Sequence, residues 1–105
     1  MEYPELKPVL ERILEVVPAR QIILFGSRAK GQAHPDSDYD LLVVVPEEYI
    51  TLESYKALYR CLGQVRRSFG VDVILTTPEQ LEHARKAWMP IHSEAQRNGQ
   101  IVYAG

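Results

Sequence analysis

Hydrophobic positions along the chain follow two different periods, one typical of helices and one typical of buried strands. In residues 4–17 the apolar side chains recur every three to four positions, which predicts an amphipathic helix ended by Pro18. Residues 51–68 carry a similar stripe. The sequence Thr-Pro-Glu-Gln at 77–80 is typical of a helix start, and that helix should run to about residue 88, with a further helical piece at 91–97.

Short apolar runs between these helices predict strands at 21–25, 38–45 and 71–75, with a terminal strand at 101–103 that we expect at a sheet edge. Strands alternating with helices predict an α/β fold, more narrowly α+β, in which helices flank a small sheet. The segment between the first two strands holds a short helix and a loop rather than a full helical crossover. A tight pairing of those two strands is therefore favoured, with an antiparallel direction as one option, and the sheet is predicted to be mixed.

Length and composition restrict the class of protein. A chain of 105 residues is predicted to form one domain, residues 1–105. The net charge of -2 gives no broad basic surface, so we expect no direct binding to nucleic acid. No apolar run is long enough to span a bilayer, and the acidic, proline-broken N-terminus is unlike a signal peptide. With Cys61 as its single cysteine, the chain is expected in the cytoplasm and away from membranes.

Two aspartates on the second predicted strand are the first candidates for chemistry. Asp38 and Asp40 are two residues apart, so both side chains should leave the same face of the strand, where their charges repel. A Mg²⁺ ion, which prefers hard oxygen ligands and substrate phosphates, would resolve that conflict. Asp72 interrupts an otherwise apolar strand. If the two strands are neighbours, Asp72 completes a three-carboxylate cluster suited to two metal ions.

A glycine turn supplies the candidate anion site. Gly26 ends the first strand, and Ser27 is a plausible cap of a short helix whose N–H groups could bind phosphate, with Arg28 adding positive charge. The turn has neither the GxxxxGK[ST] nor the GxGxxG pattern. Taken singly, a Gly-Ser turn is usually only a turn, and an Asp-x-Asp pair is usually a solvated strand end. Tyr39, between the aspartates, should point the other way into the core.

The segment GSRAKG at 26–31, followed by SDYDL at 37–41, resembles the GSxxxG…DxD signature of nucleotidyltransferases of the DNA polymerase β superfamily. The chain is most similar to the MNT-type minimal nucleotidyltransferases, many of which are antitoxins of HEPN/MNT toxin–antitoxin pairs. The amphipathic first helix, the acidic third strand and the tail GQIVY at 99–103 extend the resemblance. It implies a nucleotidyltransferase (polymerase β-like) fold.

The resemblance also implies residue roles and a reaction. Gly26 and Ser27 match the phosphate-binding turn, Asp38 and Asp40 match the metal-binding pair, and Asp72 matches the third carboxylate, which acts as a base or completes the metal site. The implied reaction uses Mg²⁺ and transfers a nucleoside monophosphate from ATP or another nucleoside triphosphate to a hydroxyl group, releasing pyrophosphate. The implied partner is a HEPN-type protein in a hetero-oligomer, because some relatives attach AMP to a tyrosine of that partner.

Three hypotheses remain open at this point. The chain is an active Mg²⁺-dependent nucleotidyltransferase that modifies a partner protein, or a catalytically silent antitoxin that neutralises its toxin by occlusion. A third class comprises nucleotide sensors and transferases that modify small molecules. The short chain argues against this third class, because nothing visible in the sequence supplies a pocket for the acceptor.

Overall fold

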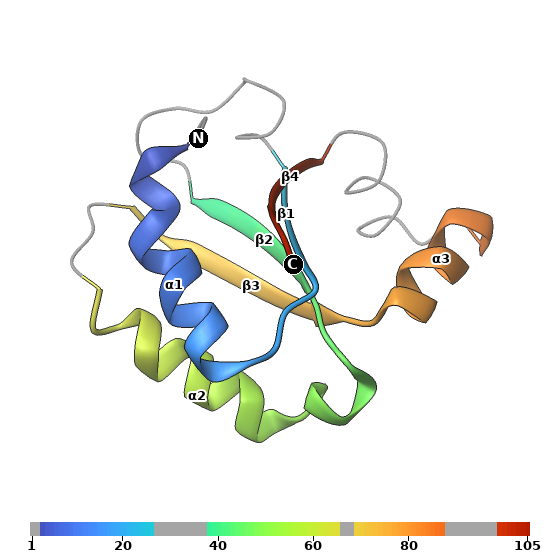
Figure 1. The fold of residues 1–105 in the computed structure, drawn as a ribbon, viewed down its shortest axis with the longest axis horizontal. Helices are drawn as coiled ribbons and strands as arrows, with labels where there is room; N and C mark the ends of the chain where they lie inside the picture. The colour runs from blue at the N-terminus through green and yellow to red at the C-terminus, as the bar shows by residue number, and fades with distance from the viewer. Residues whose placement is uncertain (1–2, 27–37, 66–68, 88–98) are drawn as a thin grey trace.

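The computed structural model describes residues 3–26, 38–65, 69–87 and 99–105, with the backbone alone for 84–87. Helices and strands alternate along most of the chain (Figure 1). In chain order the elements are the 3-10 helix η1 (Pro4–Leu6), α1 (Lys7–Val16), β1 (Gln21–Phe25), β2 (Tyr39–Val44), the 3-10 helix η2 (Glu47–Tyr49), α2 (Leu52–Leu62), β3 (Val71–Thr76), α3 (Pro78–Ala87) and β4 (Gln100–Ala104).

Within the described residues, four strands form one mixed sheet in the order β3-β2-β1-β4. β1 runs antiparallel to both of its neighbours, whereas β2 and β3 are parallel. The predicted mixed sheet with flanking helices is therefore confirmed, as are the antiparallel pairing of the first two strands and the edge position of the last one. In the part of the chain that the structure describes, no helix has the length and hydrophobicity needed to cross a membrane.

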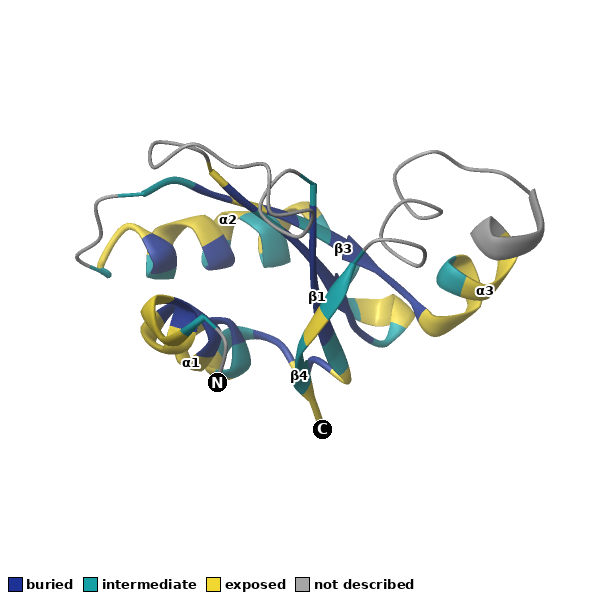
Figure 2. Cartoon of the chain, turned by 90° about the horizontal axis from the view of Figure 1, so that it is seen from above, coloured by how far each residue is buried: buried dark blue, intermediate teal, exposed yellow. Residues whose placement is uncertain are grey.

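Helices cover the two faces of the sheet unequally. α1 and α2 lie on one side and α3 lies on the other (Figures 1 and 2). On β2, the side chains of Leu41 and Val43 belong to the larger buried cluster under α1 and α2. Leu42 and Val44 belong to the smaller cluster on the opposite face, against which Leu81 of α3 packs. This alternation follows from the two-residue period of a strand.

Two helix boundaries differ from the prediction. The stripe predicted at 51–68 forms α2 only as far as Leu62, and Gly63, whose N–H donates to the carbonyl of Tyr59 at 3.0 Å, lies just beyond it. A glycine inside a helix costs about 1 kcal/mol relative to alanine, which explains the earlier end. The stripe predicted at 4–17 is divided into η1 and α1, and η2 was not predicted. The helical pieces expected at 27–30 and 91–97 lie outside the described residues.

The start of α3 matches its predicted chemistry. Thr77 accepts a hydrogen bond from the backbone N–H of Gln80 at 3.0 Å, and Pro78 occupies the first helical position. The side chain of Gln80 accepts from the hydroxyl of Thr76 at 3.1 Å instead of returning to the cap residue. Of the two reciprocal hydrogen bonds of a capping box, the structure thus has the one from the Gln80 N–H to the Thr77 hydroxyl. The Gln80 side chain instead ties the end of β3 to α3.

Two tyrosines of α2 protect the outer edge of β3. The hydroxyl oxygen of Tyr55 accepts a hydrogen bond from the backbone N–H of Leu75 at 2.8 Å, and that of Tyr59 accepts from Val73 at 3.2 Å. Because β3 is the last of the described strands at its end of the sheet, these N–H groups have no partner in another described strand on that side. Unpaired N–H groups at a sheet edge invite pairing with other chains, and the two phenols remove this hazard.

Replacing both tyrosines by phenylalanine should destabilise β3 without disturbing the core. Each lost hydrogen bond is expected to lower the free energy of unfolding by about 1 kcal/mol, and amide exchange at Val73 and Leu75 should accelerate. Urea unfolding and hydrogen exchange measure the two effects. Tyr49→Phe is the matched control, because the structure gives its hydroxyl no partner among the described residues. Unchanged exchange at both amides would contradict the role assigned to Tyr55 and Tyr59.

Candidate active site

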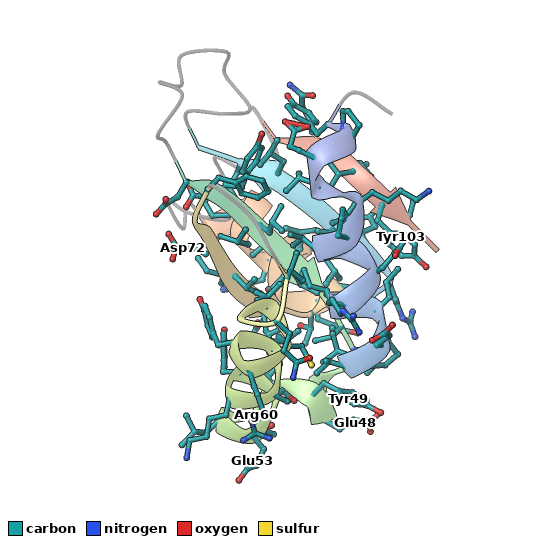
Figure 3. The ribbon with its side chains drawn as sticks, turned by 90° about the vertical axis from the view of Figure 1, so that its left-hand side faces the viewer. Glu48, Tyr49, Glu53, Arg60, Asp72 and Tyr103 are labelled. Carbon is teal, nitrogen blue, oxygen red and sulfur yellow. The ribbon has the colours of Figure 1, made fainter. Side chains whose placement is uncertain are left out.

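The parallel pairing of β2 and β3 brings two aspartates into register near the starts of both strands. Asp40 is the direct partner of Asp72, and Phe25 at the end of β1 lies opposite Asp40 on its other side. Register partners on neighbouring strands point to the same face, so the two carboxylates share the face opposite α1 and α2. The adjacency expected for Asp72 is therefore observed. Figure 3 shows Asp72 at this end of β3, far from Glu53 and Arg60 of α2.

Tyr39 anchors the strand between the two aspartates. Its side chain is only 2% exposed, and its ring meets that of Phe69 edge-on with centroids 4.9 Å apart. The hydroxyl of Tyr39 donates to the carboxylate of Glu5 in η1. The prediction that Tyr39 belongs to the core is confirmed. With this ring fixed on one face, alternation along β2 sends Asp38 and Asp40 toward the other, where Asp38 is exposed and Asp40 half-buried.

Two glycines each give room to one of these aspartates. Gly26 follows β1 with a φ of 79°, in the left-handed region, and a Cβ atom there would overlap the Oδ2 atom of Asp40. A Cβ atom on Gly70 would overlap the carboxylate of Asp38. The sequence indicates Gly26 as a residue that lets phosphate approach, but Gly70 only as the end of a helix. The sequence signal that could have pointed to Gly70 is its place two residues before Asp72, which puts both residues on the same strand face.

The carboxylates of the Asp38/Asp40 pair lean in opposite directions. Asp40 lies against Gly26 on the β1 side, whereas Asp38 lies against Gly70 on the β3 side. Among the described residues, no three His, Cys, Asp or Glu side chains are placed to hold one metal ion. The closed three-carboxylate cluster expected from the sequence is thus not observed among the described residues. The metal-binding and catalytic roles of Asp38, Asp40 and Asp72 remain predictions.

The donor set nevertheless suits a magnesium ion bound together with a substrate. Asp38 and Asp72 are exposed and Asp40 is half-buried, so water and phosphate oxygens have access to all three carboxylates. Magnesium typically takes one or two carboxylates and completes its six ligands with water and substrate phosphate. A register pair such as Asp40 and Asp72 meets that requirement. Ser27 and Arg28, predicted to bind phosphate, lie outside the described residues.

A pocket of about 330 Å³ lies at the other end of the sheet. It is lined by Arg20 and by Val44 of β2 and Leu81 of α3, among others. Val44 is the last residue of β2, whereas Asp40 is its second. This pocket is therefore separated from the aspartates by most of the length of the strand, and it offers no binding place beside the carboxylates.

Comparisons with known proteins show the family and the fold. A family model described as nucleotidyltransferase domain matches residues 6–96. The fold resembles the crystal structure of a candidate nucleotidyltransferase from Sulfolobus solfataricus, with a TM-score of 0.55 and 17% sequence identity over 91% of this chain and 74% of that one. Among proteins with curated descriptions, none matches the chain in sequence. The family match includes β1, β2 and β3, and so all three aspartates.

Proposed function

Because this chain belongs to the nucleotidyltransferase domain family, we propose that it transfers AMP from ATP to a hydroxyl group of a partner protein in the cytoplasm. In this reaction the hydroxyl oxygen forms a bond to the α-phosphorus of ATP, the bond to the bridging oxygen of pyrophosphate breaks, and the hydroxyl proton passes to a base. The observation that carries the proposal is the register pairing of Asp40 with Asp72 next to the turn at Gly26.

The three carboxylates have separate tasks in this proposal. Asp38 and Asp40 hold Mg²⁺, and Asp72 completes its binding or accepts the proton of the attacking hydroxyl. Bound there, the ion would neutralise charge on the phosphates and polarise the phosphorus. Gly26 lets the chain turn sharply beside Asp40, and Ser27 and Arg28 bind the β- and γ-phosphates at the start of the following segment.

Two features support a protein as the acceptor. Most of the described part of the chain is used for one sheet and its helices. The pocket lined by Arg20, Val44 and Leu81 lies at the far end of β2 from the aspartates. An acceptor that arrives on another chain needs no such pocket. We propose a HEPN-type toxin as that partner, with this chain as its antitoxin.

The proposal is tested by label transfer. The purified chain is incubated with Mg²⁺, its partner and ATP labelled at the α-phosphate, and label on the partner is measured. The double variant Asp38→Asn/Asp40→Asn should transfer no label above background. A matched control, Glu47→Gln/Glu48→Gln, removes two carboxylates from η2 and should transfer normally. Robust transfer by the aspartate variant would overturn the proposal.

A silent binding antitoxin is the second candidate function. It is favoured by the divergent carboxylates, since no three acidic side chains among the described residues are placed to hold one metal ion. On this alternative, Asp38→Asn/Asp40→Asn would still neutralise the toxin in a growth assay, and the wild-type chain would transfer no label. Loss of neutralisation by a variant that still binds the toxin would exclude occlusion as the mechanism.

A further inference from the structure

Four neighbouring positions at the starts of β2 and β3 form a square on the sheet face that carries the carboxylates. Asp40 is paired with Asp72, and the register begins one residue earlier, at Tyr39 and Val71. Continued back by one more residue, it sets Gly70 opposite Asp38, and the N–H of Tyr39 donates to the carbonyl of Gly70 at 2.9 Å. Positions two apart on one strand share a face. Three corners of the square are therefore aspartates, and the fourth is a glycine.

The glycine at this corner is not required by the backbone. Gly26 is the residue with a positive φ among the described glycines, so Gly70 has a conformation that alanine also adopts. The three nearest atoms that a Cβ at Gly70 would meet all belong to the carboxyl group of Asp38. The space beside Gly70 is thus filled by one specific side chain, whose position depends on the absence of a Cβ.

We propose that Gly70 is a positioning residue for Asp38, as Gly26 is for Asp40. Because Gly70 has no side chain at the fourth corner, the Asp38 carboxylate can lie over β3, the strand that carries Asp72. With a methyl group at position 70, Asp38 has to rotate about χ1 and leave β3. This inference rests on the proposed function in so far as it concerns a metal ion held by Asp38.

The test compares Gly70→Ala with Gly63→Ala in the full chain. Gly63 has φ -63° and ψ -18°, and a Cβ there would meet its nearest atom, the carbonyl oxygen of Tyr59, at an ordinary 3.4 Å. The χ1 rotamer of Asp38 is measured by NMR from three-bond couplings to its Cγ atom. Binding of Mn²⁺ alone is measured from the loss of the free-ion electron paramagnetic resonance signal.

In Gly70→Ala we expect a changed χ1 of Asp38 and a Mn²⁺ affinity lower by about 10-fold or more. The melting temperature should change by less than about 3 °C, because only the end of a short side chain has to move. Gly63→Ala should alter neither χ1 nor affinity. In an Asp38→Ala background, Gly70→Ala should cause no further loss of affinity, since the two residues act as one unit.

Other results would overturn the inference. An unchanged χ1 and affinity in Gly70→Ala would show that Asp38 does not depend on the glycine. A large drop in melting temperature that Asp38→Ala does not restore would show that the methyl group clashes elsewhere. If the wild-type chain bound no Mn²⁺, the metal-dependent function would fail, whereas the χ1 measurement would still decide whether Gly70 positions Asp38.

Discussion

Asp72→Asn is expected to slow nucleotidyl transfer by a factor between about 10² and 10⁴, the range typical of removing a catalytic acid or base. Asparagine keeps the shape of the side chain but cannot accept the proton and is a poorer ligand for a cation. The rate is measured as label transferred from α-labelled ATP to the partner. Glu53→Gln, which removes an exposed carboxylate from α2 far from Asp72 (Figure 3), is the control and should leave the rate unchanged.

In Asp72→Asn the free energy of unfolding should not fall together with the rate of transfer. Asp72 lies directly opposite Asp40, and like charges at paired strand positions are destabilising by roughly 0.2–1 kcal/mol. Asp72→Asn should therefore keep or slightly raise the free energy of unfolding measured in urea. A loss of more than about 1 kcal/mol would show that Asp72 supports the fold, and the slow transfer could not then be attributed to chemistry.

Gly26→Ala should damage both the fold and the reaction. The φ of 79° is unfavourable for alanine by about 1–2 kcal/mol, and the new methyl group would overlap the Oδ2 atom of Asp40. We expect urea unfolding to show a loss of free energy larger than this strain, because the clash with Asp40 adds to it. A displacement of a reacting group by about 1 Å can slow a reaction 10²-fold, so transfer should fall by about that factor.

A second substitution separates the two effects of Gly26→Ala. Combined with Asp40→Ala, the clash disappears and only the backbone strain remains. The stability loss should then shrink toward the strain alone, about 1–2 kcal/mol. Gly63→Ala is again the matched control for the exchange of glycine for alanine. A Gly26→Ala variant with normal stability and normal transfer would contradict the close approach of Asp40 to this turn.

Much of the fold followed from periodicity. The two-residue alternation around Tyr39 predicted which side chains enter the core and which face the aspartates would share. The acid in an apolar strand identified Asp72, and its strand does lie beside β2. These features are local, or depend on one pairing, and a sequence pattern can indicate them.

The details of the site depend on contacts between strands that no pattern records. The opposite lean of Asp38 and Asp40 follows from a glycine on each neighbouring strand, and only the register identifies Gly70 as the partner position. The early end of α2 depended on Gly63, which the amphipathic stripe alone concealed. In the sequence, the tyrosines that cover β3 are simply part of the apolar stripe of residues 51–68, because hydroxyl partners in a distant strand cannot be seen there.

The spacing of Tyr55 and Tyr59 along α2 matches the spacing of the N–H groups that they bind along β3. Four residues of a helix rise about 6.0 Å, and two residues of a strand rise about 6.6 Å. Successive outward N–H groups of β3 are thus nearly in step with successive turns of α2, and each receives one phenol. A partner that extended the sheet at this edge would have to displace both tyrosines together, so recognition by strand addition at β3 is disfavoured by the spacing itself.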